Sequence, residues 1–337
     1  MKVAIIGAGL IGTERIEAIQ SLAIDTGLVR LAHVVDPNEA VRKRVEARYG
    51  VHTTAELDSV LSARPDWVFI CTPHDVAPEI AIRAFEYGAN VLIEKPIGRT
   101  LAECDAIIAQ LPPTTKLNVG FNYRFYRGIE AAILDAKAGL FGELISVNMT
   151  LGHGNSPGME NSWKLDPARS GGGCLIDPGV HLLDLVLQLA QGEVSVIAAR
   201  SWDGFWKMGI EEEARILLRD EAQTTFDVEV SLVRWRSTFR LEINGVNGYA
   251  MVEGRGRSYG PQTYRRGKRW GWQMGVTQAD SEEIVVDRDV GTDSFIRETA
   301  IALGLQQPDV GRSLQPCGHM EARRVMELLS CIQRAMR

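Results

Sequence analysis

Cysteine is scarce in this chain of 337 residues, and its five copies stand far apart, at positions 71, 104, 174, 317 and 331. No two of them form a C-x-x-C pair, so neither a zinc site nor a disulfide framework is expected. Unpaired thiols suit a reducing compartment. We therefore expect a cytoplasmic protein without a bound metal.

Long apolar runs are also missing from the sequence. No uninterrupted apolar run approaches the roughly 18 residues that a membrane span needs. The strand-like run after Met1 reaches a glycine at Gly7, which is too soon for the core of a signal peptide. We expect neither secretion nor a membrane partner.

The chain lacks an excess of positive charge. Its 37 Lys and Arg stand against 43 Asp and Glu, which gives a formal net charge of -6. A nucleic-acid partner is not expected, because such binding needs surplus cations to displace counterions from phosphates. With 45% hydrophobic and 24% charged residues, the chain has the composition of a globular protein, and its length favours two domains.

The first third of the chain alternates short β-type runs with helical stretches. The β-type runs are residues 3–6, 30–35, 66–72, 90–94 and 117–121. Strands separated by helices are typical of a parallel sheet. Gly88 stands where a helix over about 76–87 needs a left-handed cap. We predict an α/β domain over residues 1–121.

This rhythm changes after residue 122. We predict a helix near 129–138, a strand over 143–151, a polar loop over 152–173 and an apolar helix over 178–190. Four or five β-type runs then follow one another, with 193–202, 212–219, 223–233, 238–244 and 249–253 as candidates, and helices near 293–303 and 318–336 close the chain. Runs joined without helices imply an antiparallel or mixed sheet. We predict an α+β domain over 122–337 with an open, largely antiparallel sheet.

A glycine motif, G-x-G-x-x-G, follows the first strand and opens a helix. It comprises Gly7, Gly9, Leu10, Ile11 and Gly12. The first glycine allows a tight turn, the second lets backbone approach a pyrophosphate, and the third permits close helix packing. The second strand ends at Asp36, whose carboxylate can accept hydrogen bonds from an adenosine ribose. Dinucleotide binding by a Rossmann domain is favoured over a merely structural glycine turn.

Asp36 also bears on the choice of cofactor. Its carboxylate would repel the 2'-phosphate of NADP, and the next two residues carry no cation. Arg42, Lys43 and Arg44 lie along the next helix and would have to fold back to help NADP. We interpret them as a solvated helix face, so NAD is predicted and NADP is less favoured.

The tripeptide Glu94-Lys95-Pro96 closes another strand, and ligands bind at the carboxyl ends of such strands. With this segment the chain resembles the Gfo/Idh/MocA oxidoreductase family over nearly its whole length. In that family the E-K-P segment supplies a substrate-site lysine, which matches Lys95. The resemblance also places Glu94 and Lys95 at the cofactor.

The resemblance adds Thr72, Pro73 and His74 to the cofactor site. After the Thr-Pro pair the family often has an asparagine and, three residues on, a histidine. This chain has His74 and Ala77 at those positions, so contacts there are expected to differ.

A second family element, D-x-x-x-H, matches Asp177 and His181, which complete the site with Lys95. Asn122 and Arg124 resemble the family's segment after the last Rossmann strand and are assigned to the substrate. Along the predicted apolar helix, one polar stripe remains, formed by Asp177, His181, Asp184 and Gln188. Such a stripe must find partners or line a cavity. The simpler alternative is that Asp177 caps the helix and His181 is a satisfied core histidine.

The segment from Arg255 to Arg269 holds six Lys and Arg, and no acidic residue occurs between Gly254 and Ala279. It also carries Tyr259 and Tyr264, with Trp270 and Trp272 just beyond. Three interpretations stay open: contact with the phosphate of a substrate, a subunit interface, or a solvated hairpin. The last two are favoured, since charged runs usually lie on surfaces. Four further histidines (33, 52, 153 and 319) have no evident partner and are expected to be structural or exposed.

The resemblance implies an NAD-dependent dehydrogenase or reductase that acts on an alcohol or ketone of a sugar, free, phosphorylated or nucleotide-linked. His181 is the preferred base, because imidazole titrates near neutrality and Asp177 can orient it, while Lys95 polarises the substrate oxygen. Two alternatives remain: a sugar-modifying hydrolase or epimerase that uses NAD transiently, and a non-catalytic sugar- and dinucleotide-sensing regulator. The family is commonly oligomeric through its second sheet, so a homo-oligomer is expected.

Overall fold

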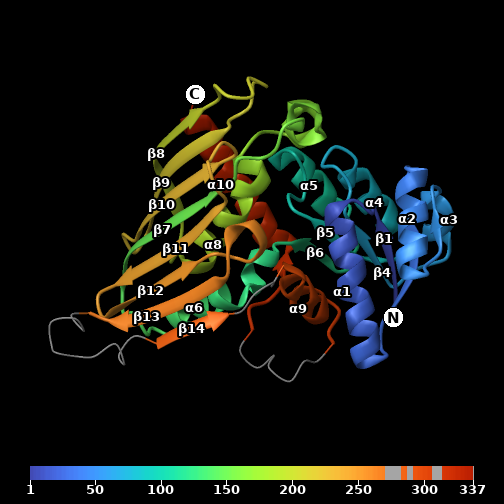
Figure 1. The fold of residues 1–337 in the computed structure, drawn as a ribbon, viewed down its shortest axis with the longest axis horizontal. Coiled ribbons are helices and arrows are strands. Elements are labelled where there is room, and N and C mark those ends of the chain that lie inside the picture. Colours follow the sequence, from blue (N-terminus) through green and yellow to red (C-terminus); the bar gives the residue numbers. More distant parts are fainter. Residues whose placement is uncertain (270–281, 287–290, 306–312, 337) are drawn as a thin grey trace.

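The computed structural model describes residues 1–269, 282–286, 291–305 and 313–336. It contains two sheets, each with its own set of helices (Figure 1). The helices α6, α8 and α10 lie between the two sheets (Figure 1). The protein is therefore layered, with one sheet at one end of the molecule and a helix-flanked sheet at the other.

The first sheet has the strand order β15-β6-β5-β4-β1-β2-β3. Its parallel strands are β1 (Lys2–Ile6), β2 (Arg30–Val35), β3 (Thr53–Thr54), β4 (Trp67–Ile70), β5 (Asn90–Glu94) and β6 (Leu117–Gly120). The helices that join them are α1 (Leu10–Thr26), α2 (Glu39–Tyr49), α3 (Leu57–Ser62), α4 (Ala77–Glu86) and α5 (Leu101–Ala109). All four residues of β4 are buried, which is typical of a parallel strand covered by helices on both faces.

The second sheet has the order β14-β13-β12-β11-β7-β10-β9-β8. Its strands are β7 (Leu144–Gly152), β8 (Val194–Trp202), β9 (Glu213–Asp220), β10 (Thr225–Ser231), β11 (Thr238–Gly245), β12 (Gly248–Glu253), β13 (Gln262–Lys268) and β14 (Glu282–Val286). Among the described strands of this second sheet, only β7 and β10 pair in parallel. The prediction of an open, largely antiparallel sheet is confirmed.

One face of this sheet is buried and the other is not. In β9, Ala214, Ile216 and Leu218 are buried, while Arg215 and Arg219, which point to the other face, are exposed. The buried face packs against helices of the middle layer, namely α6 (Arg127–Lys137), α8 (Val180–Leu189) and α10 (His319–Ala335). Strict alternation of this kind is what a strand with one solvated face requires.

The last part of the chain returns to the first sheet. Strand β15 (Cys317–Gly318) pairs antiparallel with β6, and α9 (Gly291–Ala302) packs against α1. Arg15 of α1 is fully buried and binds Glu94 at 2.8 Å and Glu298 of α9 at 2.5 Å. This ion pair network ties the end of β5 to a helix contributed by the C-terminal part of the chain.

The predicted elements differ from the observed ones at edges and kinks. β13 and β14 were not predicted, because β13 carries several charged residues instead of an alternating apolar pattern. The apolar helix predicted from residue 178 begins at Val180. Asp177 has extended φ/ψ angles (-143°, 102°), so it lies before the helix and the predicted four-residue stripe does not start on it.

The segment Pro167–Leu189 is long and apolar enough to cross a membrane by length and composition alone, and 78% of its most apolar window is buried inside the protein. Leu182, Leu183, Leu185 and Val186 of α8 have no exposed surface. This segment is part of the core between the two sheets.

Candidate active site

The glycine turn leaves room for a ligand at one position only. Gly7 has φ +88°, and a Cβ there would lie 2.7 Å from the carbonyl oxygen of Cys71. A Cβ on Gly12 would lie 2.0 Å from the carbonyl oxygen of Gly7. A Cβ on Gly9, in contrast, would meet nothing within 4 Å. Gly7 and Gly12 are therefore required by packing, whereas Gly9 leaves open space at the N-terminus of α1.

Two polar groups flank this turn. Asp36 accepts hydrogen bonds from the amides of Ala8 and Asn38, both at 2.9 Å, so its carboxylate braces the turn. The hydroxyl of Thr72, beside Gly7, is buried and has no hydrogen-bond partner among the described residues. An open turn, an acid at the end of β2 and an unpartnered buried hydroxyl fit a bound dinucleotide. Leu10 and Ile11 form the first turn of α1 below it.

Lys95 and Asp177 meet where β5 ends. The ammonium of Lys95 donates a hydrogen bond to Oδ1 of Asp177, and Nζ of Lys164 lies 2.8 Å from Oδ2. Burial alone would raise the pKa of Asp177, but Lys164 and then Lys95 hold it well below its usual value. The carboxylate stays ionised and fixes both lysines. The expected role of Asp177 in orienting His181 is replaced, in these contacts, by orienting Lys95.

His181 lies in the first turn of α8 and is 5% exposed. Its ring stacks on Tyr123 with centroids 3.8 Å apart and meets the edge of Phe121 at 5.8 Å. Nδ1 is buried and has no partner among the described residues. Burial, and after it the charge of Lys95, place the pKa of His181 well below its usual value. The imidazole is therefore neutral at pH 7 and can accept a proton.

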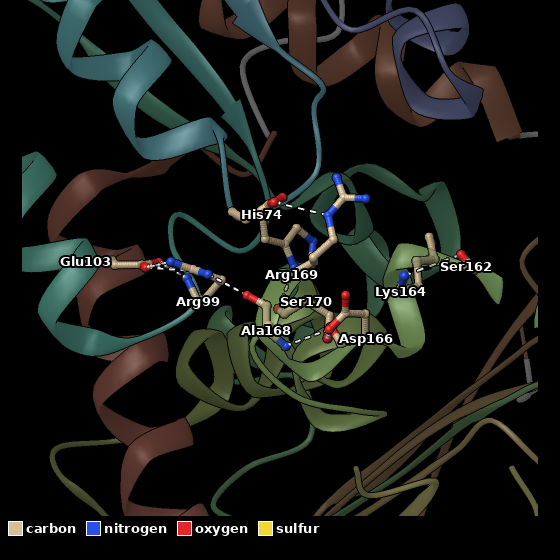
Figure 2. Close-up of polar contacts among 10 residues, drawn as sticks. His74, Arg99, Glu103, Ser162, Lys164, Asp166, Ala168, Arg169 and Ser170 are labelled. Carbon is tan, nitrogen blue, oxygen red and sulfur yellow. Dashed lines mark hydrogen bonds and ion pairs between the residues drawn. The ribbon is translucent and has the colours of Figure 1, made fainter. Parts of the chain in front are cut away.

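His74 connects the first domain to the loop that precedes Asp177. Its Nδ1 lies 2.8 Å from the carbonyl oxygen of Ser170, and its ring meets Trp163 edge-on at 4.8 Å. Burial lowers the pKa of His74 to about 4, so the ring is neutral and donates this hydrogen bond. Figure 2 shows His74 over the short helix α7 (Pro167–Ser170), with Arg99 reaching the carbonyl of Ala168 from the other side. These contacts fix the loop against the Rossmann edge.

Comparisons with known proteins agree with this geometry. Residues 1–121 match the family described as "Oxidoreductase family, NAD-binding Rossmann fold", and residues 135–251 match "GFO/IDH/MocA C-terminal domain". The chain belongs to the Gfo/Idh/MocA oxidoreductase family. Its first domain is accordingly an NAD-binding Rossmann fold.

Individual relatives cover less of the chain. Levoglucosan dehydrogenase of Pseudarthrobacter phenanthrenivorans is 29% identical over 49% of this chain and 44% of its own length. Inositol 2-dehydrogenase of Rhizobium meliloti is 29% identical over 56% of this chain and 57% of its own. The chain thus spans about half the length of these curated relatives. A solved levoglucosan dehydrogenase in complex with NADH and levoglucosan has a TM-score of 0.82 at 20% identity and covers 99% of this chain and 96% of its own, which supports the fold.

Two arginines of α2 depart from the expected solvated face. Arg42 donates to the carbonyl of Asp36 at 2.7 Å, and Arg44 reaches the carbonyl of Ala8 at 3.3 Å. The predicted solvated face is wrong for Arg42, which is half-buried and folds back onto the end of β2, whereas the Arg44 side chain stays exposed while it reaches the turn. Lys43 does lie in solvent, paired with Glu39. In this family member the cofactor turn therefore has cations beside Asp36.

Asn122 and Arg124 bind residues of neighbouring helices outside the site. Asn122 donates to the hydroxyl of Ser294 in α9 at 2.9 Å. Arg124 is buried and binds Asp184 at 2.5 Å, and it also contacts Glu321 at 3.2 Å. Asp184 of the predicted stripe thus has a structural partner, as does Gln188, which binds Lys137. Of that stripe, Asp177 and His181 belong to the site.

The basic segment finds its acidic partners elsewhere in the chain. Arg257 pairs with Glu14, Arg266 with Asp135 at 2.6 Å, and Arg265 lies 3.9 Å from Glu253. Arg257 lies in the short helix η5 (Arg257–Tyr259), while Arg265 and Arg266 lie on β13. All three have acidic neighbours, so their charges give no reason to expect a bound phosphate at these positions. Trp270 and Trp272 lie outside the described residues.

Arg255 differs from its neighbours and belongs to the site. Its guanidinium lies 3.7 Å from the ring centroid of Tyr259 and 5.0 Å from that of Tyr123, the ring that stacks on His181. Sequence reasoning missed Tyr123, Lys164 and Arg255 as site residues. His153, which was expected to be structural or exposed, accepts the amide hydrogen of Asn155 at 3.2 Å.

Proposed function

We propose that this protein is an NAD-dependent oxidoreductase that acts on a CH–OH or ketone group of a sugar or sugar derivative. One observation carries the proposal: the buried imidazole of His181 and the ammonium of Lys95 lie in one site at the end of β5, which only β4 separates from β1 and its glycine turn. Such a pair supplies a proton acceptor and a cation for a developing alkoxide. The names of the curated relatives, which act on levoglucosan and inositol, favour a polyhydroxylated substrate.

The bound dinucleotide supplies a hydride acceptor for the substrate carbinol carbon. His181 takes the hydroxyl proton, because its lowered pKa keeps it unprotonated at pH 7. Lys95 stabilises the negative charge that grows on the oxygen as this proton leaves. Asp177 holds Lys95 in place and stays ionised throughout. In the reverse direction, His181 returns the proton to the oxygen.

The remaining expectations extend this proposal. We place the domain boundary after residue 121, with α9 and β15 as a returning part of the second domain. The outer face of the second sheet is proposed as the contact of a homo-oligomer. Among the described residues it carries polar pairs such as Arg215 and Glu229, 3.1 Å apart, and has no covering helix. Free thiols at all five cysteines suit a cytoplasmic location. Cross-linking and a solution mass would test the oligomer.

Incubation with NAD and a panel of sugars tests the function. Net NADH formation is expected for the dehydrogenase. A sugar altered without NADH formation would instead identify a hydrolase or epimerase that uses NAD transiently. Binding of sugar and NAD without any chemical change would identify a sensing regulator. The Lys95→Ala protein is the control for chemistry that does not use this site.

A further inference from the structure

Lys164 is a site residue that the reaction described above does not use. It lies on the turn η3 (Trp163–Leu165), in the loop between β7 and α8. The loop is fixed on one side by Trp163 against His74, and Ser162 accepts the amide hydrogen of Lys164 at 3.3 Å. These contacts position the ammonium 2.8 Å from Oδ2 of Asp177.

Lys164 is also the accessible cation of the pair that binds Asp177. Its side chain is 43% exposed, against 13% for Lys95 and 15% for Asp177. Because both lysines hold the same carboxylate, a substrate bound at Lys95 lies within reach of the Lys164 ammonium. Lys164 can thus donate to the substrate with hydrogens that Asp177 does not occupy.

The charges around His181 do not balance. The side chains that act most strongly on it are Lys95, Asp177, Arg255 and Lys164, which are three cations and one carboxylate. Asp177 is also the carboxylate that raises the pKa of Lys164. This surplus stands in a chain whose formal net charge is -6. A concentration of positive charge in a partly desolvated site favours an anionic ligand.

We propose that Lys164 is a substrate-binding residue that selects a sugar derivative carrying an anionic group, a carboxylate or a phosphate, near the reacting carbinol. The proposal rests on the proposed function for the position of that carbinol at Lys95 and His181. A neutral sugar offers Lys164 only hydroxyl oxygens, whereas an anion forms a charge-assisted hydrogen bond and compensates the surplus charge. The alternative is that Lys164 only positions Asp177, in which case it treats neutral and anionic sugars alike.

Matched sugar pairs distinguish these roles. The probes are glucose, galactose and mannose, each beside its uronate and its 6-phosphate, tested for NADH formation and, by calorimetry, for binding to the protein saturated with NADH. The variants are Lys164→Gln, Lys164→Arg and, as a matched surface control, Lys43→Gln, because the Lys43 side chain is 72% exposed. The uronate and phosphate arms decide which anion is recognised.

We expect at least one anionic sugar to bind more tightly than its neutral parent. Lys164→Gln should weaken that anion roughly 10–100-fold, the size of a hydrogen bond to a charged group, and the neutral sugar less than about threefold. Lys164→Arg should restore part of the loss, and Lys43→Gln should change neither. Binding of the preferred anion should also weaken as salt is raised.

Three results would overturn the inference: no anionic sugar binding better than its neutral parent, equal losses for both classes in Lys164→Gln, or anion binding that does not depend on Lys164. The first would leave a neutral-sugar enzyme, and the second would reduce Lys164 to positioning Asp177. Failure of the proposed function looks different. In that case anions bind in a Lys164-dependent way, yet no sugar of either class yields NADH or an altered product.

Discussion

The cofactor half and the catalytic half of this site are built on different principles. The cofactor half is a backbone turn made by six consecutive residues, Gly7 to Gly12, with one carboxylate beside it at Asp36. The catalytic half is made of side chains from four separate segments, represented by Lys95, Tyr123, Lys164 and His181. A turn made by adjacent residues tolerates change around it, whereas a cluster of side chains depends on every element that delivers one.

The two halves also differ in charge. Asp36 makes the cofactor half anionic, relieved by Arg42 and Arg44 at the backbone carbonyls. The catalytic half is cationic and keeps its histidine neutral. Cofactor choice and proton chemistry should therefore respond to separate substitutions. A variant in the catalytic half should leave cofactor affinity unchanged, and a variant in the cofactor half should leave the pH profile of oxidation unchanged.

The sharpest test of the catalytic half is His181→Ala. Loss of the proton acceptor should lower the rate constant for oxidation by roughly 10²–10⁴-fold while NAD affinity stays close to that of the parent. Steady-state rates and NADH titration measure the two quantities, and His319→Ala serves as a control at a histidine outside the site. Near-parental turnover, with deuterated substrate showing that chemistry limits the rate, would remove His181 from the base role and leave Lys95 as the candidate.

Substitution of Arg15 tests whether both halves of the site depend on the same buried ion-pair network. It is fully buried between Glu94, which precedes Lys95, and Glu298. Arg15→Ala leaves two buried carboxylates without their cation, so we expect the free energy of unfolding to fall by about 3–5 kcal/mol. Arg48→Ala, which removes a surface pair with Glu17, should cost at most about 1 kcal/mol. Denaturant melts of the two variants compare these costs, and equal losses would contradict the proposed network.

The same cluster predicts a pH dependence of stability. Burial raises the pKa of Glu298 to about 7, and the guanidinium of Arg15 only partly offsets this rise, to which the carboxylate of Glu94 adds. A carboxyl group with a raised folded pKa stabilises the fold when it is protonated, so its contribution is complete below about pH 4.5 and is lost as pH rises toward 7. Glu298→Gln should reduce the fall in the free energy of unfolding between pH 5 and 7.5. An unchanged slope in that variant would assign the fall to other groups.

Asp36 tests the independence of the cofactor half. Asp36→Ser removes the carboxylate that would repel a 2'-phosphate, and with it an acceptor for the amide of Ala8. We expect the ratio of NAD to NADP affinity to drop by at least about tenfold, or about 1.4 kcal/mol, with the pH profile of oxidation unchanged. Arg42→Ala separates the contribution of the nearby guanidinium. A parent that already prefers NADP would refute the interpretation of β2.

The two halves also differ in how well the sequence alone predicts them. The glycine turn and Asp36 could be predicted because local spacing alone builds that half. Lys95, Asp177 and His181 came from the family resemblance, and Asp177 was assigned to a helix that begins three residues later. Lys164 carries no local signal, since a single lysine in a polar loop looks like surface until the fold brings it to Asp177.

In the basic segment, residues that look alike in the sequence have different roles in the structure. Its arginines were considered as one group, but their partners come from other parts of the chain. Arg266 pairs with Asp135 on α6, and Arg257 pairs with Glu14 on α1. Arg255 alone among these three lies over the rings of Tyr259 and of Tyr123, which stacks on His181. Composition within a segment cannot separate these roles, because each depends on which distant strand or helix lies opposite.

The smallest and most specific effect is expected for the substitution of Arg255, and it concerns the pH dependence of oxidation. Burial and Lys95 dominate the lowered pKa of His181, and Arg255 adds to them through its position beyond Tyr123. Because the unprotonated imidazole is the active form, oxidation should stay on its plateau at pH 6.5 and fall only well below it. Arg255→Gln removes a cation that disfavours protonation, so the pKa of His181 should rise and the acidic limb of kcat/KM should move to higher pH, by less than about one unit. Lys95→Met should move the same limb further, since its ammonium acts more strongly. A limb that moves to lower pH, or that shifts equally in Arg48→Gln, would show that Arg255 does not act on His181.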